Sequence, residues 1–184
     1  MRCSHRASAM LALLLALCCA IGEGTLSAAG PTTLYLPTVS AGPVPTPTLD
    51  PGASMEGRIA DLINAVRVDH GLAPLALSVE LAGAARLHSA DMAANAFFDH
   101  VGSDGSTPGE RMEAAGYPWY ACGEIIAAGY ASAEEVVDGW MGSEGHREAI
   151  LCTLYQDMGV GYVHDATSVY GRYYTVDFAA LQGQ

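Results

Sequence analysis

The chain has 184 residues, of which 51% are hydrophobic, and its 20 acidic and 8 basic residues give a formal net charge of −12 at pH 7. This length allows one folded domain with additional segments. A surface with this excess of negative charge repels phosphate backbones and anionic membranes at long range, so nucleic-acid binding is not expected.

The N-terminus has the pattern of an export signal. Two arginines precede the apolar run MLALLLALCCA at 10–20, which is too short to span a bilayer because a spanning helix takes about 20 residues. We therefore predict a signal peptide over 1–22 and a secreted, extracellular protein with no transmembrane segment after signal removal. Lipid attachment at Cys18 or Cys19 is an alternative.

Residues 23–54 have the composition of a linker. They are rich in Pro, Thr, Gly and Ser, and the prolines of GPVPTPTLDPG (42–52) lie too close together for a helix or a central strand. The short apolar run LYLP (34–37) is either a strand that docks on the domain or a part of the tether. The folded domain is therefore expected at 55–181.

Removal of the leader changes both the charge and the number of cysteines. The formal charge moves from −12 to −14, and Cys122 and Cys152 are the two cysteines that remain. In an exported protein two cysteines at this separation predict one disulfide, and closing a loop of about thirty residues is worth roughly 3–4 kcal/mol in the chain-entropy model. Two unpaired buried thiols are the alternative.

The domain begins with a predicted amphipathic helix. Apolar residues follow the helical spacing at Ile59, Leu62, Ile63 and Val66. The helix starts near Met55, and Gly71 and Pro74 end it. His70 falls in the last turn, where the helix dipole favours a positive charge, so we assign it a structural role.

A second helix is expected from the N-cap Ser78 to about Asn95. Its apolar stripe contains Leu81, Ala84, Ala85, His88 and Met92. A histidine on such a stripe is more often a hydrogen-bonded core residue than a ligand, so His88 is predicted to lie in the core.

Two further helices carry N-terminal capping signals. Thr107, Pro108 and Glu110 form a capping-box pattern with proline at the first helical position. Ser132 and Glu135 repeat the same spacing before an apolar run. Both glutamates are therefore interpreted as capping groups and not as site residues.

Three strands are predicted, at 123–129, 158–164 and 171–179. The first is short, apolar and bounded by glycines, whereas the other two alternate and are rich in Val and Tyr. The DATSVY stretch between the last two favours an antiparallel hairpin. Helices followed by a terminal hairpin predict an α+β fold in which helices cover a small antiparallel sheet.

The sequence excludes several classes of enzyme site. No GxSxG serine elbow and no HExxH zinc helix occur, and His146 and Glu148 match only half of a zinc deaminase signature because its C-x-x-C half is absent. The candidates that remain are two histidines, His100 and His146, and the carboxylate of Glu124. Two imidazoles and one carboxylate can bind zinc with a position left for water, or can form a metal-free hydrogen-bonded cluster.

Six segments, taken together and in their order, resemble a known family. They are LINAVRVDHGLAPL, LHSADMAANAFFDH, DGSTPGERMEAAGY, CGEIIAAGY, VVDGWMGSEGHREAIL and DMGVGY. Over about 56–180 the chain thus resembles the CAP superfamily (cysteine-rich secretory proteins, antigen 5 and pathogenesis-related 1 proteins) in its bacterial SCP-like extracellular form. The resemblance implies a three-layer α-β-α sandwich with a cleft lined by a His/Glu tetrad.

The resemblance assigns roles by position. His100 matches the first histidine of the tetrad, Glu124 the glutamate of the G-E-N motif, and His146 the histidine of the G-H motif. In some family members the two histidines bind a divalent metal such as zinc. This makes His100 and His146 candidate metal ligands, and Zn²⁺ or another divalent cation a candidate cofactor.

Two positions depart from the family pattern. Ile125 replaces the asparagine that follows the glutamate, which removes a side-chain amide beside the cleft. Ser143 stands where the second glutamate of the tetrad is expected, and Glu144 follows one position later. Because a one-residue step turns a helical side chain by about 100°, Glu144 joins the cluster only if the helix ends or unwinds near Gly142.

The incomplete tetrad favours a binding module over an enzyme, and no catalytic residue is assigned. We expect a monomeric extracellular protein whose cleft takes a small amphipathic ligand, lipid-like or sterol-like as the resemblance implies, or a cell-envelope component. Two alternatives stay open: a metal-dependent hydrolase with His100 and His146 as ligands and Glu124 as base or third ligand, or a structural envelope or stress protein. Four aromatic residues flank the site segments and either line a groove or have ordinary structural roles: Tyr117, Trp119, Tyr120 and Tyr130.

Overall fold

The computed structural model describes residues 4–5 and 54–181, which belong to one compact unit. The helices are α1 (Met55–Asp69), α2 (Val79–Asn95), α3 (Pro108–Ala114), α4 (Ala133–Met141) and α5 (Glu144–Ile150). The strands are β1 (Ser4–His5), β2 (Ala76–Leu77), β3 (Trp119–Ala128), β4 (Asp157–His164) and β5 (Arg172–Leu181).

The strands form one mixed sheet in the order β1-β3-β5-β4-β2. The predicted terminal hairpin is confirmed, because β4 and β5 pair antiparallel from Asp157 opposite Ala179 to His164 opposite Arg172. The other long neighbour of β5 is β3, also antiparallel, and it begins at Trp119, earlier than predicted. The two-residue strand β2 pairs parallel with β4 and was not predicted.

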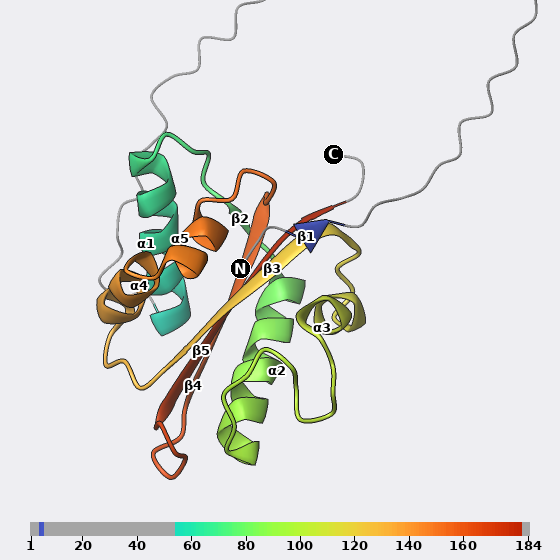
Figure 1. Ribbon diagram of the computed structural model, residues 1–184, viewed down its shortest axis with the longest axis vertical. Coiled ribbons are helices and arrows are strands. Elements are labelled where there is room, and N and C mark those ends of the chain that lie inside the picture. The colour runs from blue at the N-terminus through green and yellow to red at the C-terminus, as the bar shows by residue number, and fades with distance from the viewer. Residues whose placement is uncertain (1–3, 6–53, 182–184) are drawn as a thin grey trace, which may run out of the picture. The chain divides into compact units, whose positions relative to one another are not determined.

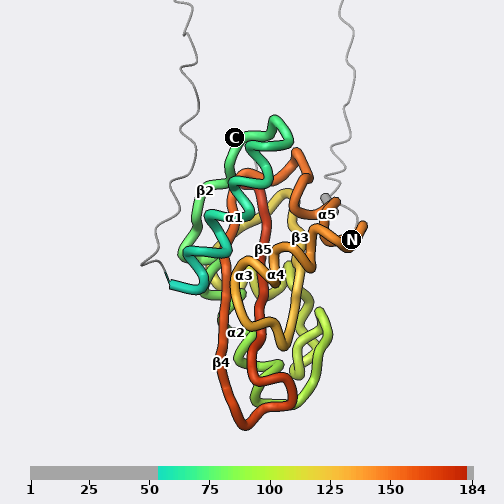
Figure 2. The backbone as a smooth tube through the Cα atoms, turned by 90° about the vertical axis from the view of Figure 1, so that its left-hand side faces the viewer, coloured from blue at the N-terminus to red at the C-terminus, as the bar shows by residue number. Residues whose placement is uncertain are grey.

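Helices cover both faces of the sheet. Helices α1, α4 and α5 lie on one side and α2 and α3 lie on the other (Figure 1). Figure 2 views the molecule from the side of α1, α4 and α5 and shows the long strands running behind them. The predicted three-layer α-β-α sandwich is confirmed. We call the two faces of the sheet the α1 side and the α2 side.

The α1 side holds a continuous apolar core. Alternate residues of β3, β4 and β5 point into it, such as Ile125, Val160 and Val176, and meet the apolar faces of the helices. Its largest fully buried side chains include Trp140 and Phe178. A layer built in this way follows from period-2 strands facing period-3.6 helices.

The α2 side is built differently. Its apolar residues fall into two separate clusters, one made of Leu81, Met112, Tyr117, Cys122 and Ala179 and the other of Met92, Ala93, Ile126 and Tyr173. This side also holds the buried polar residues His88, Ser89, Glu124, Thr175 and Asp177. Strand alternation places Glu124, Thr175 and Asp177 on the α2 side, since their neighbours in sequence point into the α1-side core.

Two glycines of β4 let α2 approach the sheet closely. A Cβ atom at Gly159 would lie 2.0 Å from the backbone nitrogen of Ala82, and one at Gly161 would lie 2.2 Å from the backbone carbonyl carbon of Ala85. No side chain fits at either position. The M-G-V-G-Y segment therefore combines large residues on the α1 side with glycines beneath α2.

The predicted helix starts are confirmed by their caps. The hydroxyl of Ser78 accepts a hydrogen bond from the backbone N–H of Leu81, and Thr107 and Glu110 form the complete capping box. Ser132 caps α4 through the backbone N–H of Glu135. His70 ends α1, and its ring donates to the carbonyl of Val66, which fits its structural assignment.

A buried arginine links α1 to the loop after α5. The guanidinium of Arg67 donates to the backbone carbonyls of Ala73, Ile150 and Cys152 at 2.7–3.0 Å. Burial lowers the pKa of Arg67. The sequence reading did not single out this residue, which holds two chain segments of the α1 side together.

The predicted disulfide between Cys122 and Cys152 is not formed. Cys122 lies in an apolar cluster of the α2 side, whereas Cys152 lies in the core of the α1 side. Successive residues of a strand point to opposite faces, and Ala121, next to Cys122, is the one that faces the α1 side. The sheet therefore separates the two sulfur atoms.

Most of the predicted leader and linker lie outside the described residues. Of 1–22, only Ser4 and His5 are described, as the strand β1 that pairs with Cys122 and Ala121 of β3. Of 23–54, only Ser54 is described, as the N-cap of α1. Within the described residues, no helix has the length and apolar character needed to cross a membrane.

Candidate functional site

The centre of the site is a buried carboxylate with two cationic or polar donors. His100, in the loop after α2, donates from Nδ1 to Glu124 Oε1 at 2.7 Å. Arg111 of α3 donates to Glu124 Oε2 at 2.6 Å and also to the backbone carbonyls of His100 and Ser106. We call these three residues the His100–Glu124–Arg111 cluster.

The partners of Glu124 stabilise its buried carboxylate. The Glu124 side chain is fully buried, and a buried carboxylate is stable only when it is paired and hydrogen-bonded, which Arg111 and His100 provide. Because His100 donates from Nδ1, its Nε2 carries the lone pair when the ring is neutral. The side chain of His100 is 30% exposed, so this lone pair belongs to the accessible end of the cluster.

His88 lies behind the cluster, in the core as predicted. Its Nε2 donates to the carbonyl of Asp99 at 2.9 Å and lies 3.9 Å from Glu124 Oε1. Burial lowers the pKa of His88, although Glu124 opposes the shift. Its Nδ1 is buried and has no hydrogen-bond partner among the described residues.

His146 of α5 interacts electrostatically with His100. Burial lowers the pKa of His146, and the charge of His100 lowers it further. His146 also lines a hollow of about 330 Å³, which we call the His146 hollow. Its lining residues are Phe98, Ile126, Ala127, Ala128, Tyr130, Gly139, Trp140, Ser143 and His146.

The hollow lies beside the outer edge of β3, so residues from both faces of the sheet line it. Ile126 points to the α2 side and Ala127 to the α1 side, so its wall includes the outer edge of β3. Among the described strands, only β1 pairs with that edge, at Ala121 and Cys122. Residues of both sides, Phe98 and His146 among them, therefore reach one hollow.

Glu144 does not join the cluster. The condition for its joining, a helix break near Gly142, is met. Helix α4 ends at Met141, and α5 starts at Glu144 with Ser143 as its N-cap. Glu144 is nevertheless exposed and is absent from the lining of the His146 hollow. The break turns His146 toward the hollow and leaves Glu144 outside it.

The described residues offer no third protein ligand for the predicted zinc site. Both carboxylate oxygens of Glu124 already accept short hydrogen bonds, from His100 and from Arg111. Among residues 4–5 and 54–181, no three His, Cys, Asp or Glu side chains are arranged so that they could hold a metal ion. His100 and His146 remain as two ligands, fewer than the three protein ligands of a catalytic zinc site.

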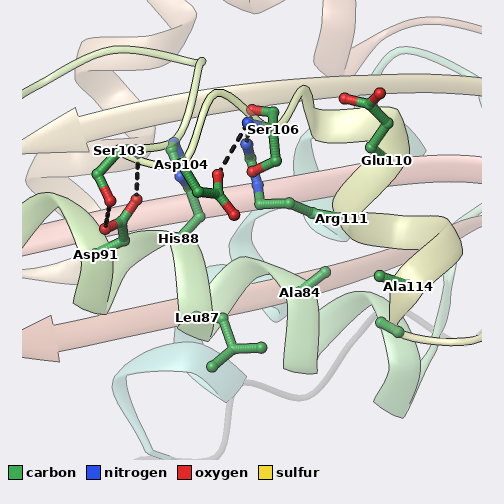
Figure 3. A pocket seen from close by; sticks show the side chains of 11 residues that line it. Ala84, Leu87, His88, Asp91, Ser103, Asp104, Ser106, Glu110, Arg111 and Ala114 are labelled. Atoms are coloured by element: carbon green, nitrogen blue, oxygen red, sulfur yellow. Dashed lines mark hydrogen bonds between the residues drawn. The ribbon is translucent and has the colours of Figure 1, made fainter.

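A larger cavity of about 520 Å³ lies between α2, α3 and the loop that joins them (Figure 3). His88 and Arg111 line it together with Asp91, Asp104 and Glu110. Each of these three carboxylates already accepts hydrogen bonds from nearby residues of the loop or of α3's first turn. These three carboxylates of the larger cavity are therefore already engaged in hydrogen bonds within the protein.

Sequence reasoning missed two residues of the site region. Arg111 was read only as part of the T-P-G-E-R-M helix start, although it is the cation that neutralises Glu124. Asp177 lies opposite Glu124 on β5 and is fully buried. One signal was present for Asp177, because it is the only acidic residue in the predicted strand of 171–179.

Of the four flanking aromatic residues, Tyr130 alone lines the His146 hollow. Tyr117 is buried, packs in an α2-side cluster and donates to the carboxylate of Asp157. Trp119 packs against the same cluster and donates from Nε1 to the carbonyl of Gly109. Ile125, at the family's asparagine position, is buried in the α1-side core, on the face opposite Glu124.

Comparisons with known proteins place these features in a family. A family model described as CAP, the cysteine-rich secretory protein family, matches residues 60–178. The protein YkwD of Bacillus subtilis (strain 168), described as uncharacterized, is 38% identical over 115 residues, which make up 62% of this chain and 45% of YkwD.

Two solved bacterial structures share the fold of this chain. An extracellular protein containing a SCP domain from Bacillus anthracis has a TM-score of 0.62 and 34% identity, and the match covers 68% of this chain and 40% of that one. An outer surface protein of Borrelia burgdorferi has a TM-score of 0.61 and 22% identity over 67% of this chain and 90% of that one, which supports the fold alone. The present chain spans less than half the length of YkwD and of the B. anthracis protein.

Proposed function

Because the chain belongs to the CAP (cysteine-rich secretory protein) family, we propose that it acts outside the cell as a binding module. Its ligand is a small amphipathic molecule, with an apolar part in the His146 hollow and a polar part at the His146 and His100 rings. The observation that carries this proposal is the lining of the hollow, in which a histidine stands among apolar and aromatic residues.

The rim of the hollow offers apolar surface to a ligand. Phe98 is 44% exposed and Tyr130 is 36% exposed, and both line the hollow. Phe98 also packs edge-to-face against Tyr170, itself half exposed, with the ring centroids 6.0 Å apart. Aromatic side chains at such a rim lose surface to a ligand at little entropic cost, since few bonds must be fixed.

Binding fits the cluster better than hydrolysis does. The His100 ring is oriented by Glu124 as in many acid–base sites, but no three His, Cys, Asp or Glu side chains in the described part of the chain are arranged to hold a metal ion. A hydrolase is therefore the alternative that the test must separate. The predicted signal and the similarity to an extracellular protein of Bacillus anthracis support the extracellular location.

The test uses cis-parinaric acid, a fluorescent fatty acid, titrated into the secreted protein. We expect a saturable rise in fluorescence for the wild type. The Phe98→Ala/Tyr130→Ala double variant should bind at least about tenfold more weakly, because each ring contributes on the order of 1 kcal/mol or more of apolar contact. Leu87→Ala, which alters an exposed leucine of the larger cavity, is the matched control and should bind like the wild type.

Three outcomes would count against the proposal. One is the absence of saturable binding at micromolar probe, and another is equal weakening by Leu87→Ala. The third is hydrolysis of a protein or nucleic-acid substrate that His100→Ala abolishes, which would favour the hydrolase. Melting temperatures of all variants, measured alongside, identify a loss of binding that is only a loss of folding.

A further inference from the structure

Two buried carboxyl groups lie side by side on neighbouring strands of the sheet. Glu124 of β3 and Asp177 of β5 are directly paired in the antiparallel register, and both point to the α2 side. Their exposed fractions are 1% and 0%. Directly opposed residues of neighbouring strands have Cβ atoms about 4.5–5.5 Å apart, which brings the two side chains into contact range.

The two groups differ in their hydrogen bonds. Each oxygen of Glu124 accepts one, from His100 and from Arg111. Neither oxygen of Asp177 has a hydrogen-bond partner among the described residues when the group is treated as an acceptor. An ionised carboxylate so placed would lack any donor and would adjoin a second negative charge, which is a costly arrangement in a protein interior.

The alternative is that Asp177 is itself a donor. We infer that Asp177 is a positioning residue, whose carboxylic acid O–H donates a hydrogen bond to the Glu124 carboxylate and so fixes the acceptor that orients His100. Glu124 then has three donors, from three different elements: the loop after α2, helix α3 and strand β5. A carboxylate accepts this number readily, since its two oxygens offer about four lone-pair sites.

The surroundings of Asp177 on balance favour its protonated form. Burial raises the pKa of Asp177 well above its usual range, and the negative charge of Glu124 raises it further, while Arg111 opposes both effects. On β4 the paired residue is Gly159, which carries no charge. On α2, His88 lies 3.9 Å from Glu124, and burial disfavours its charged form.

The inference concerns the protein without a ligand, so it stands or fails apart from the proposed function. It also gives Asp177 a role that a purely apolar residue could not fill. Leu or Val at this position would fill the space but would leave Glu124 with two donors. An asparagine would keep a donor, because its amide N–H₂ can replace the acid O–H.

The test compares Asp177→Asn, Asp177→Ala and Thr175→Val in the secreted protein. Thr175 is the matched control, because it is buried on the same face of β5 two residues away and bonds to Ser89 at 2.9 Å. Melting temperatures are measured from pH 4 to pH 8. The ring signals of His100 are followed by ¹⁵N NMR, and the carboxyl carbon of Asp177 by ¹³C NMR.

The expected signs follow from linkage. The unfolded chain releases the Asp177 proton near pH 3.9 and the folded chain retains it, so the contribution of Asp177 to the stability of the wild type falls as the pH rises above about 4. Asp177→Asn lacks this loss and should melt above the wild type at pH 7, by about 4 °C or more. The excess should shrink toward pH 4. Asp177→Ala should melt below Asp177→Asn at every pH.

The spectra separate positioning from packing. His100 signals should be preserved in Asp177→Asn and altered in Asp177→Ala, and Thr175→Val should change neither these signals nor the dependence on pH. The Asp177 carbon should keep the shift of a protonated acid at pH 7. A carbon that titrates near pH 4 in the folded protein, or an Asp177→Asn variant that melts as low as Asp177→Ala, would overturn the inference.

Discussion

Helices cover both sides of the sheet, but the contacts that hold them differ between the α1 side and the α2 side. On the α1 side, alternate strand residues and three helices bury a continuous apolar core. On the α2 side, two smaller apolar clusters are accompanied by His88, Glu124, Thr175 and Asp177, and α2 lies directly on glycines of β4. One helical layer is thus held by hydrophobic burial and the other by close backbone contact around a polar centre.

The difference separates stability from site building. An apolar layer tolerates substitutions that keep its volume, so it can maintain the fold with little constraint on individual residues. A buried charged network contributes little net stability and is damaged by the loss of any one member. The polar residues of the α2 side are therefore expected to be sensitive to changes that the α1 side would accept.

The largest effect is expected from breaking the buried ion pair. Arg111→Leu leaves the Glu124 carboxylate buried without its cation, and this should lower the free energy of unfolding by about 3–5 kcal/mol. Urea denaturation at pH 7 measures the change. Arg58→Ala is the control, because its pair with Glu134 at 2.7 Å lies at the surface, where water screens it, and should contribute little to stability. Equal losses in the two variants would contradict the comparison.

The close approach of α2 gives the next largest effect. Gly161→Ala places a Cβ atom against the backbone of Ala85, so α2 must move, and we expect a loss of about 3 kcal/mol or failure to fold. Gly83→Ala, within α2 itself, has open space around the new Cβ and should be neutral or stabilising by up to about 1 kcal/mol. Thermal unfolding of both variants is the measurement, and a mild Gly161→Ala would show that α2 is not held by close contact.

The histidines should make stability depend on pH. His88 and His146 both have lowered pKa values, chiefly through burial, so the unfolded chain binds protons that the folded chain excludes. The contribution of the two histidines to stability should therefore fall as the pH drops below about 6.5, with a slope of at most about 1.4 kcal/mol per pH unit for each excluded proton. Unfolding measured from pH 8 to pH 5 should show a smaller slope for His146→Gln, and an unchanged slope would exclude His146 as a contributor.

The smallest effect is expected for the two cysteines. Because the sheet separates Cys122 from Cys152, peptide mapping of the secreted protein without reductant should find no fragment that joins them. Cys122→Ala should lower the melting temperature by the same amount with and without reductant, since it removes packing and not a cross-link between these residues. A peptide linking Cys122 to Cys152 would overturn the assignment of the two side chains to opposite faces.

The fold was largely predictable because its signals are local. The starts of α2, α3 and α4 follow from caps at Ser78, Thr107 and Ser132, and the terminal hairpin follows from alternation and a turn. Strand β2 escaped prediction, because two residues carry no period and their pairing with β4 depends on a distant segment. The break between α4 and α5 at Gly142 and Ser143 was not predicted outright. It entered only as the condition under which Glu144 would join the cluster.

The sequence by itself determined the family, the sandwich and the three residues His100, Glu124 and His146, since motif order and periodicity are properties of the chain alone. The tertiary structure decided which groups meet. It brought Arg111 to Glu124, placed Asp177 opposite that carboxylate and kept Cys122 away from Cys152. These outcomes depend on strand register and on the face to which a side chain points, and a shift of one residue would reverse the face.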